Sequence, residues 1–292
     1  MMITFPAYVD RGAGLPALTR IPYFPKQAID VLCKYDAVIL VGANEPVAFF
    51  GYKGGNSYYL SDKQNKLRID TDSQDSTAAI VALAEVLDAP EYSRVTSGFL
   101  AEYKLPEIPS GRLNPENMCA IVAALQPENC IIVEEGLMSA AKYHAFAANL
   151  KPHSYITITG GAIGQGMPCA LGAALACPDR QVINIEADGS AMYTLQALWT
   201  QARENTNVIT LICSNRKYAT IEYEYLQAGH GQPGLSTMSL IQLENPKIDW
   251  IDISRGMNVP AVSVSTSQEL VSELELALCE SGPHLIEVIF NA

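Results

Sequence analysis

The sequence predicts an α/β fold in which parallel sheets are covered by helices on both faces. From about residue 114 onward, short and almost continuous apolar segments alternate with segments of helical periodicity. Strands of this kind belong to parallel sheets buried on both faces. The composition supports buried cores, because hydrophobic residues make up 49% and charged residues 17% of the chain. The length of 292 residues suggests two compact domains at about 150 residues each.

The first part of the chain shows a short α/β pattern that ends near residue 90. Pro25 is expected to open a helix with an apolar face, and residues 37–41 form a buried-type strand that ends at Gly42. A weaker strand is expected at 67–69, and a second amphipathic helix carries apolar residues between 80 and 87. Residues 89–112 contain scattered Pro and Gly without periodicity. We therefore expect domains at 1–90 and 113–292, joined by a linker at 91–112.

The second part begins with a helix, for which Asn114 is the expected cap and Pro115 lies in the first turn. The expected strands are 130–133, 155–159, 181–187, 208–213, 261–264 and 285–290. Helices are expected at 165–176, around 195–202, after 218 and around 270–278. Trp199 lies on the apolar stripe of the second of these and is expected in the core. Parallel sheets of this kind bind ligands beyond the carboxyl ends of their strands.

Charge and targeting signals narrow the class of protein. Lys plus Arg total 19 against 31 for Asp plus Glu, a net charge of -12, so general binding of nucleic acid is not expected. The apolar runs are short and interrupted by Gly and Pro, which argues against a membrane span. The N-terminus lacks a basic region followed by an apolar core. None of the seven Cys are spaced C-x-x-C, so we expect reduced thiols in a cytoplasmic protein.

Two polar elements that follow successive strands are the candidate functional site. Asp188, Gly189 and Ser190 come at the end of one strand, and Asn215 follows the next strand, 27 positions later. A right-handed crossover brings both to the same end of the sheet. Carboxylate and amide oxygens suit Mg²⁺, and Ser190 with the following helix N-terminus can bind an anion. Asp188 and Asn215 could instead be ordinary turn and cap residues, but a second Gly-rich loop at 159–168 favours a metal and diphosphate site.

This arrangement resembles the signature of enzymes that depend on thiamine diphosphate (ThDP). Residues 187–190 with Asn215 resemble the Gly-Asp-Gly and Asn-Asn elements, with Ala187 in place of the first Gly and Ser214 in place of the first Asn. The loop at 159–168 resembles the one that cradles the cofactor. The chain is most similar to the benzoylformate decarboxylase and acetolactate synthase group. The resemblance implies that 113–292 is the family's ThDP diphosphate-binding domain, preceded by part of its central, Rossmann-like domain at 1–90.

The resemblance also implies roles for individual residues. Mg²⁺ would be bound by the Asp188 and Asn215 side chains and the Lys217 carbonyl. Gly161 would offer its carbonyl to the cofactor's amino group, and Ile163 would be the wedge that folds the cofactor so that this group nears the reacting carbon. Both are therefore the candidate catalytic residues. The full cofactor-binding set is Leu137, Met138, Gly161, Ile163, Ala187, Asp188, Gly189, Ser190, Tyr193, Asn215, Lys217 and Tyr218.

The same resemblance implies substrates and partners. Thr220 and Ile221 would face a 2-oxo acid substrate, whereas Glu134 and Glu135, at a strand end, are not expected to act as acid or base. The family's N-terminal pyrimidine-binding domain, with its essential Glu, is not recognisable, so a fragment and a chain completed by a partner both remain open. We expect a homo-oligomer, inactive as an isolated chain. The Gln-Trp element of acetolactate synthases is not matched at 220–224, so a benzoylformate-type decarboxylase, a nucleotide-binding module and a catalytically silent subunit remain as alternatives.

Overall fold

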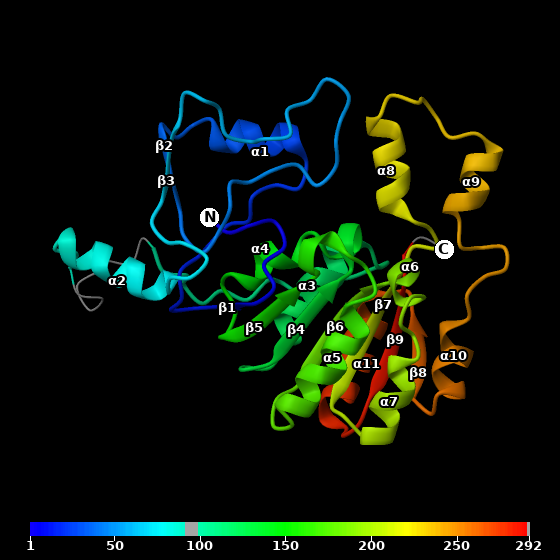
Figure 1. Ribbon diagram of the computed structural model, residues 1–292. Helices are drawn as coiled ribbons and strands as arrows, with labels where there is room; N and C mark the ends of the chain where they lie inside the picture. The colour runs from blue at the N-terminus through cyan, green and yellow to red at the C-terminus, as the bar shows by residue number, and fades with distance from the viewer. Residues whose placement is uncertain (91–98, 291–292) are drawn as a thin grey trace. The chain divides into compact units, whose positions relative to one another are not determined.

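The computed structural model describes residues 1–90 and 99–290 and divides into two units (Figure 1). The smaller unit comprises Met1–Thr4 and Leu18–Phe99, and the larger comprises Phe5–Ala17 and Leu100–Ala292. The segment Phe5–Ala17 therefore belongs to the larger unit, although it lies within the range 1–90 expected for the first domain. The domain boundaries at 90 and 112 stay predictions.

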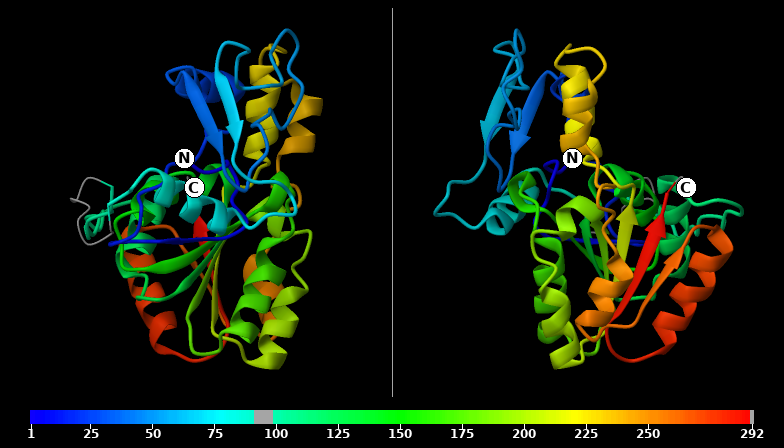
Figure 2. Two further views of the ribbon diagram at one scale, coloured as in Figure 1. Left: turned by 60° about the vertical axis from the view of Figure 1, so that its left-hand side comes forward. Right: turned by 90° about the vertical axis from the view of Figure 1, so that its right-hand side faces the viewer.

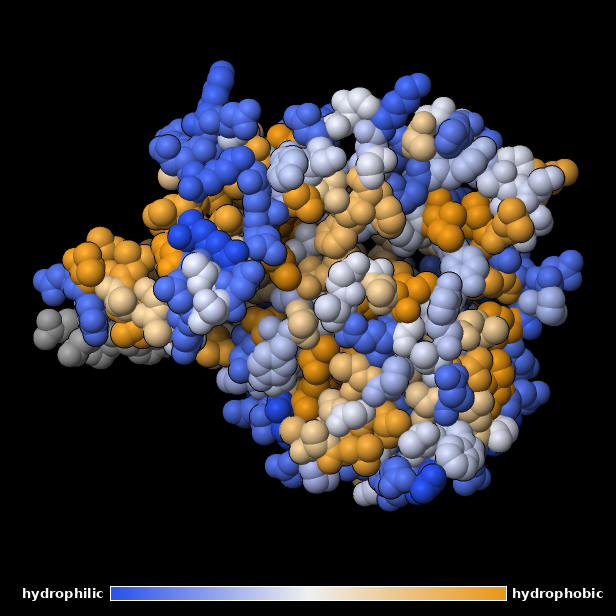
Figure 3. All heavy atoms as spheres, in the orientation of Figure 1, coloured by the Kyte–Doolittle hydropathy of each residue, from blue (hydrophilic) through white to orange (hydrophobic). Residues whose placement is uncertain are grey.

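The smaller unit is built on two parallel strands, β2 and β3. Its elements are α1 (Pro25–Leu32), β2 (Ala37–Leu40), β3 (Asn65–Arg68) and α2 (Ser76–Val86). Pro25 opens α1, where its fixed φ suits the first turn. The Asp75 side chain caps α2 by accepting from Thr77 N and Ala78 N. Figure 3 shows hydrophobic side chains gathered on α2, none of whose residues is buried.

The larger unit is organised around a seven-stranded sheet in the order β1-β5-β4-β6-β7-β9-β8. Its strands are β1 (Val9–Arg11), β4 (Ile131–Glu135), β5 (His153–Thr157), β6 (Val182–Ala187), β7 (Val208–Ser214), β8 (Ala261–Val264) and β9 (His284–Ile289). All neighbouring pairs are parallel except β1 with β5, which is antiparallel. The predicted α/β fold with a parallel sheet is confirmed, and the short antiparallel edge strand was not foreseen.

Helices cover both faces of this sheet (Figures 1 and 2). The helices of the larger unit are α3 (Pro115–Leu125), η2 (Leu137–Ala140), α4 (Tyr143–Ala147), η3 (Thr159–Gly161), α5 (Gly166–Ala176), α6 (Asp188–Ala191), α7 (Ala197–Glu204), α8 (Ala219–Gln227), α9 (Leu235–Ile241), α10 (Trp250–Gly256) and α11 (Ser267–Cys279). Of these, α3, α4 and α11 pack on one face and α5, α7 and α10 on the other, whereas α8 and α9 project beyond the end of the sheet (Figure 1). The alternation along β6 divides the core, because Ile183 faces α3 and α11 while Val182 faces α5. Both faces are buried, as the continuous apolar strands require.

The prediction that Trp199 lies in the core is wrong. Its neighbour Leu198 is fully buried, but Trp199 is 54% exposed. Successive residues of a helix differ by about 100° in direction, so Leu198 and Trp199 cannot both face the sheet. The Arg203 guanidinium lies 5.6 Å from the Trp199 ring centroid and covers part of it.

None of the helices in the described part of the chain has the length and apolar character needed to cross a lipid bilayer. All seven cysteines are free thiols.

Candidate functional site

The carboxyl ends of β4, β6 and β7 lie side by side. The register pairs Glu135 with Glu186 and Ala187 with Cys213, so the three following turns start at the same level of the sheet. This places Asp188 next to the turn that contains Asn215, as the spacing predicts. The end of the sheet at which these strands finish is called the carboxyl end below, and the opposite end the amino end.

Asp188 is the central carboxylate at the carboxyl end. It is 2% exposed, and its Oδ2 accepts a hydrogen bond from Arg216 N at 2.6 Å while its Oδ1 accepts from Gly189 N at 2.8 Å. Burial, with a smaller contribution from the Glu287 charge, raises the pKa of Asp188 to about 6. The carboxylate thus joins the turns after β6 and β7. A cation bound here would compensate the lost hydration of its charged form.

The turn after β7, whose Arg216 N–H is bonded to Asp188, carries two further oxygen atoms that can bind a cation. Asn215 Oδ1 accepts from Lys217 N at 3.0 Å, and the Lys217 carbonyl accepts from Ala219 N at 2.9 Å. The Lys217 ammonium is turned to Glu222, 2.6 Å away. Carboxylate and carbonyl oxygens have two lone pairs each, so each can also take a metal. In the described ranges no cluster of three or more His, Cys, Asp or Glu side chains could hold a metal. This donor set of one carboxylate, one amide and one carbonyl therefore suits Mg²⁺ that keeps other oxygen ligands.

A close approach of Tyr218 makes residue 189 a position for glycine. A Cβ built on Gly189 would lie 2.5 Å from Cε1 of Tyr218, too near for any side chain. The pKa of Tyr218 is raised by burial and by the nearby Tyr193 and Asp188. Ser190 is buried, whereas Tyr193 is 61% exposed. Asp188, Gly189 and Ser190 lie in the four-residue α6, and the helix expected around 195–202 is α7, which starts at Ala197.

The Gly-rich loop lies beyond the carboxyl end of β5. Gly160, Gly161 and Gly164 have φ of 63°, 75° and 94°, a region that glycine adopts without strain. Gln165 ties the loop to β5, because its amide oxygen accepts from Thr159 N at 3.0 Å and its amide nitrogen donates to Thr157 O at 3.1 Å. A Cβ on Gly164 would be 2.9 Å from Tyr193 Cβ. The loop that carries Gly161 and Ile163 thus reaches the segment that follows Asp188.

Glu135, at the end of β4, is hydrogen-bonded to the same loop. Its two carboxylate oxygens accept hydrogen bonds from Gly164 N and Gly166 N. Glu135 and Glu186 are 0% and 1% exposed. Burial raises the pKa of Glu135, and it raises the pKa of Glu186 further, with the charge of Glu135 adding to the effect. The sequence shows two acids at a strand end but gives no sign that one of them binds a loop thirty residues away.

Leu137 and Met138 belong to η2, directly after β4. Leu137 has φ of 50°, and its N–H donates to Glu134 Oε1 at 3.2 Å, while Met138 is 41% exposed. The helix α8 packs against η2 and carries Thr220 and Ile221. The two expected cofactor contacts and the two expected substrate contacts therefore lie on neighbouring elements.

Comparison with known families decides which enzymes this site resembles. Residues 137–288, more than half of the chain, match the thiamine pyrophosphate enzyme, C-terminal TPP binding domain. The chain belongs to the thiamine pyrophosphate enzymes. Its similarity to them covers Asp188, Asn215 and Lys217, whose individual roles stay proposals.

Similarity to individual proteins extends over most of the chain. A protein named as acetolactate synthase large subunit IlvX of Mycobacterium tuberculosis is 38% identical over 98% of this chain and 55% of its own length. Benzoylformate decarboxylase of Pseudomonas aeruginosa is 34% identical over 61% of this chain and 32% of its own. The structure of the thiamine diphosphate-dependent 4-hydroxybenzoylformate decarboxylase of Rhodococcus jostii aligns with a TM-score of 0.76 at 25% identity, covering 94% of this chain and 54% of that one. The chain thus spans about half the length of these relatives, or less.

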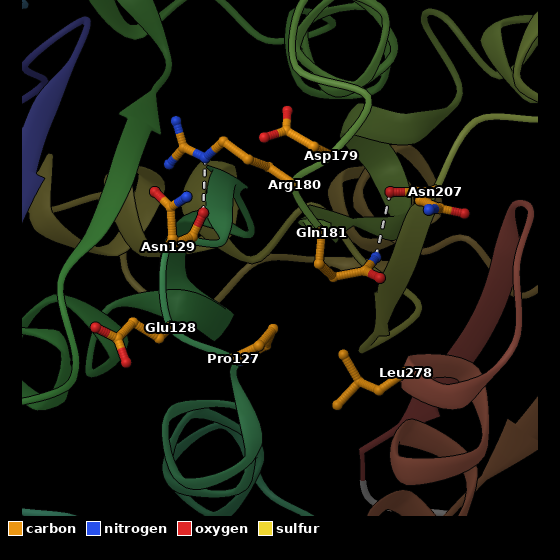
Figure 4. A pocket seen from close by; sticks show the side chains of 8 residues that line it. All are labelled: Pro127, Glu128, Asn129, Asp179, Arg180, Gln181, Asn207 and Leu278. Atoms are coloured by element: carbon orange, nitrogen blue, oxygen red, sulfur yellow. Dashed lines mark hydrogen bonds between the residues drawn. The ribbon is translucent and has the colours of Figure 1, made fainter.

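A separate cavity of about 370 Å³ lies at the amino end of the sheet (Figure 4). Arg180 Nε donates to Asn129 O at 2.6 Å, and Gln181 Nε2 donates to Asn207 O at 3.2 Å. None of the residues expected to bind ThDP lines this cavity. Arg180 and Gln181 have a structural role here, since they donate to backbone carbonyls that precede β4 and β7.

Proposed function

We propose that the chain is the Mg²⁺- and ThDP diphosphate-binding portion of a 2-oxo acid carboligase or decarboxylase similar to acetolactate synthase. Asp188 is the observation on which the proposal rests. It is a buried carboxylate at the carboxyl end of a parallel sheet, bonded to the turn that contains Asn215 and Lys217, inside the matched TPP binding domain. Such a group favours a divalent cation, and the cation favours a diphosphate.

The proposed roles are those that the resemblance to thiamine diphosphate enzymes implies for these residues. Asp188, Asn215 and the Lys217 carbonyl hold Mg²⁺, and the backbone of Gly189 approaches the diphosphate, with the Tyr218 ring packed where a side chain would be. The Gly161 carbonyl and the Ile163 side chain orient the other end of the cofactor from the Gly-rich loop. The remaining proposed contacts are Leu137, Met138, Ala187, Ser190 and Tyr193. Bound ThDP supplies a nucleophilic carbon for the 2-oxo acid carbonyl and accepts the electron pair left when CO₂ departs.

Further groups are needed for a complete active site. We propose that a pyrimidine-binding portion, in the same protein or in a partner subunit, supplies the acid that acts on the cofactor's other ring, within a homo-oligomer in the cytoplasm. The half-length coverage of the named relatives supports this division of the site. The isolated chain is then expected to bind ThDP with Mg²⁺ and to have no turnover.

The test is calorimetric titration of the full chain with ThDP and Mg²⁺. Asp188→Ala should weaken binding by about 100-fold or more, because residues one shell further from a metal already contribute roughly 10–100-fold. Asp179→Ala is the matched control, since Asp179 is an exposed acid at the amino end and should bind as the wild type does. Equal affinity of Asp188→Ala and the wild type would refute the metal assignment. Binding of NAD in place of ThDP, without Mg²⁺, would favour the nucleotide-binding alternative.

A benzoylformate-type decarboxylase is the second candidate, because a named benzoylformate decarboxylase is 34% identical over the matched region. The two activities differ in what is added after CO₂ is lost: a second carbonyl compound in a carboligase, and a proton in a simple decarboxylase. The assembled enzyme is the chain together with the pyrimidine-binding portion. Its incubation with pyruvate should give acetolactate if it is a carboligase. Release of CO₂ with aldehyde alone would identify a simple decarboxylase.

A further inference from the structure

The Gly-rich loop is bonded to the end of β4 through one buried carboxylate. Glu135 is fully buried at the end of β4, and each of its two oxygens accepts one backbone N–H, from Gly164 and from Gly166. The loop has little conformational preference of its own, because three of its glycines adopt positive φ. The position of the segment 164–166 relative to β4 therefore depends on this side chain.

A second buried carboxyl, that of Glu186, borders the same part of the loop. Glu186 faces Glu135 from the paired position on β6. A Cβ built on Gly166 would collide with Glu186 Oε2 and lie 3.1 Å from Glu135 Oε2, so both acids border the same point of the loop. Of the groups around Glu135, those that favour its charged form are the backbone N–H groups of Gly164, Gln165 and Gly166. The loop and the carboxylate therefore stabilise each other.

Ile163 directly precedes the first of these bonded glycines. We infer that Glu135 is a positioning residue of the cofactor site: by accepting the N–H groups of Gly164 and Gly166, it fixes the backbone from which Gly161 and Ile163 act. This inference rests on the proposed function for the roles of Gly161 and Ile163. The hydrogen bonds themselves do not depend on it.

A packing role for Glu135 makes a different prediction from an acceptor role. Gln has the same shape as Glu but offers one acceptor oxygen, and its amide group would place N–H against N–H at the second glycine. Glu135→Gln therefore removes one of the two bonds and keeps the volume. If Glu135 only fills space, nothing in the loop should change.

The experiment is amide hydrogen exchange, followed by NMR, on the full chain without cofactor. In Glu135→Gln, the amide of either Gly164 or Gly166 should exchange about 10-fold faster, while amides of β6 and β7 keep their wild-type rates. Glu287→Gln is the matched control, because Glu287 is an equally buried carboxyl on β9 whose Oε2 accepts from Ser263 at 2.6 Å. It should leave both glycines unchanged. Wild-type protection of both glycines in folded Glu135→Gln would overturn the inference.

A second variant covers the case in which Glu135→Gln does not fold. Glu135→Asp keeps the charge but shortens the side chain by one methylene, so both glycine amides should exchange faster. Full protection of both in this variant would also overturn the inference.

Cofactor measurements then separate this inference from the proposed function. If the wild-type chain does not bind ThDP with Mg²⁺, the proposed function fails and the exchange result still decides whether Glu135 holds the loop. If the wild type binds, Glu135→Gln in the assembled enzyme should lower kcat about 10-fold with a smaller change in ThDP affinity. Unchanged kcat at saturating ThDP would show that the hydrogen bonds do not position the reacting groups.

Discussion

The two ends of the large sheet satisfy their polar groups in different ways. At the amino end, Arg180 donates to the carbonyls of Asn129 and Cys130 and to Ser154 Oγ, so one cation joins three segments. At the carboxyl end, the carboxylates of Glu135 and Asp188 are buried. In the hydrogen bonds described above, both accept only from backbone N–H groups.

This difference separates a structural end from a functional one. Side chains that saturate backbone carbonyls stabilise the fold and leave little capacity for a ligand. Buried acids with raised pKa values cost stability in the empty protein, which a bound cation can recover. The cavity of about 370 Å³ is at the amino end, yet the chemistry of the side chains favours the carboxyl end as the functional one.

Two glycines of α5 should give the largest contrast. Gly166→Ala places a methyl group against Glu186 Oε2 and should destabilise the chain by about 2 kcal/mol. Gly172, six residues further along the helix, has no atom within 4 Å of a built Cβ, so Gly172→Ala should stabilise by about 0.5–1 kcal/mol. Urea unfolding of both variants measures this. A neutral Gly166→Ala would mean that the carboxyl end is not tightly packed.

Ile163→Ala should act on chemistry more than on binding. Ile163 is half-buried and lies in the loop that Glu135 holds, so its loss should alter the geometry of the bound cofactor. In the assembled enzyme we expect kcat to fall about 10-fold, or about 1.4 kcal/mol, with ThDP affinity nearly unchanged. The exposed Leu175 of α5 provides the control as Leu175→Ala. An effect on affinity alone, with full turnover at saturation, would contradict the wedge role.

Arg180→Ala should affect stability without affecting the cofactor. Removal of a partly exposed guanidinium with three acceptors should cost about 1 kcal/mol, as measured by urea unfolding. Arg180→Lys should recover only part of this, because an ammonium lacks the planar fork. ThDP affinity should be the same in all three proteins. A loss of ThDP binding in Arg180→Ala would remove the distinction between the two ends.

The smallest effect is a pair of opposite pH slopes. Burial raises the pKa of Glu186, so above pH 4.5 the unfolded chain ionises first and stability falls as pH rises. Burial lowers the pKa of His153, at the amino end of β5, so below pH 6.5 the unfolded chain takes up the proton first and stability falls as pH falls. The melting temperature of Glu186→Gln relative to wild type should therefore rise between pH 4 and 7. That of His153→Gln should rise between pH 7.5 and 5.

Parallel slopes for the two variants would show that the two ends do not differ in this way. Because only the change with pH is compared, a constant packing loss in either variant cancels.

The sheet and the adjacency of Asp188 and Asn215 could be predicted, since both follow from local patterns. Apolar strands and one crossover place the ends of β6 and β7 together, and Arg216 N does bond to Asp188. The antiparallel β1 could not be predicted, because three residues with one half-buried Val show no period. Trp199 was misplaced because a stripe defined by spacing alone does not separate Leu198 from its neighbour.

The role of Glu135 could not be predicted from the sequence either. An acid at a strand end is compatible with a cap, an ion pair or a solvated surface. Its actual partners, Gly164 and Gly166, are about thirty positions away and bond through their backbones. Because every residue type except proline has a backbone N–H group, the sequence does not show which residues will donate to such an acid.

The edge strand β1 has a consequence for how the chain is made. Translation produces Phe5–Ala17 before most of the smaller unit, and β5, the strand with which β1 pairs, only after that unit. The chain therefore passes between the two units more than once, since Met1–Thr4 and Leu18–Phe99 of the smaller unit flank Phe5–Ala17 of the larger one. A single proteolytic cut or truncation cannot separate the two. A fragment that starts at residue 100 would lose β1 together with the Pro6 carbonyl that accepts from Thr157 Oγ1 at 2.8 Å. It would leave the backbone of β5 unpaired along one side, where strands of other molecules could add.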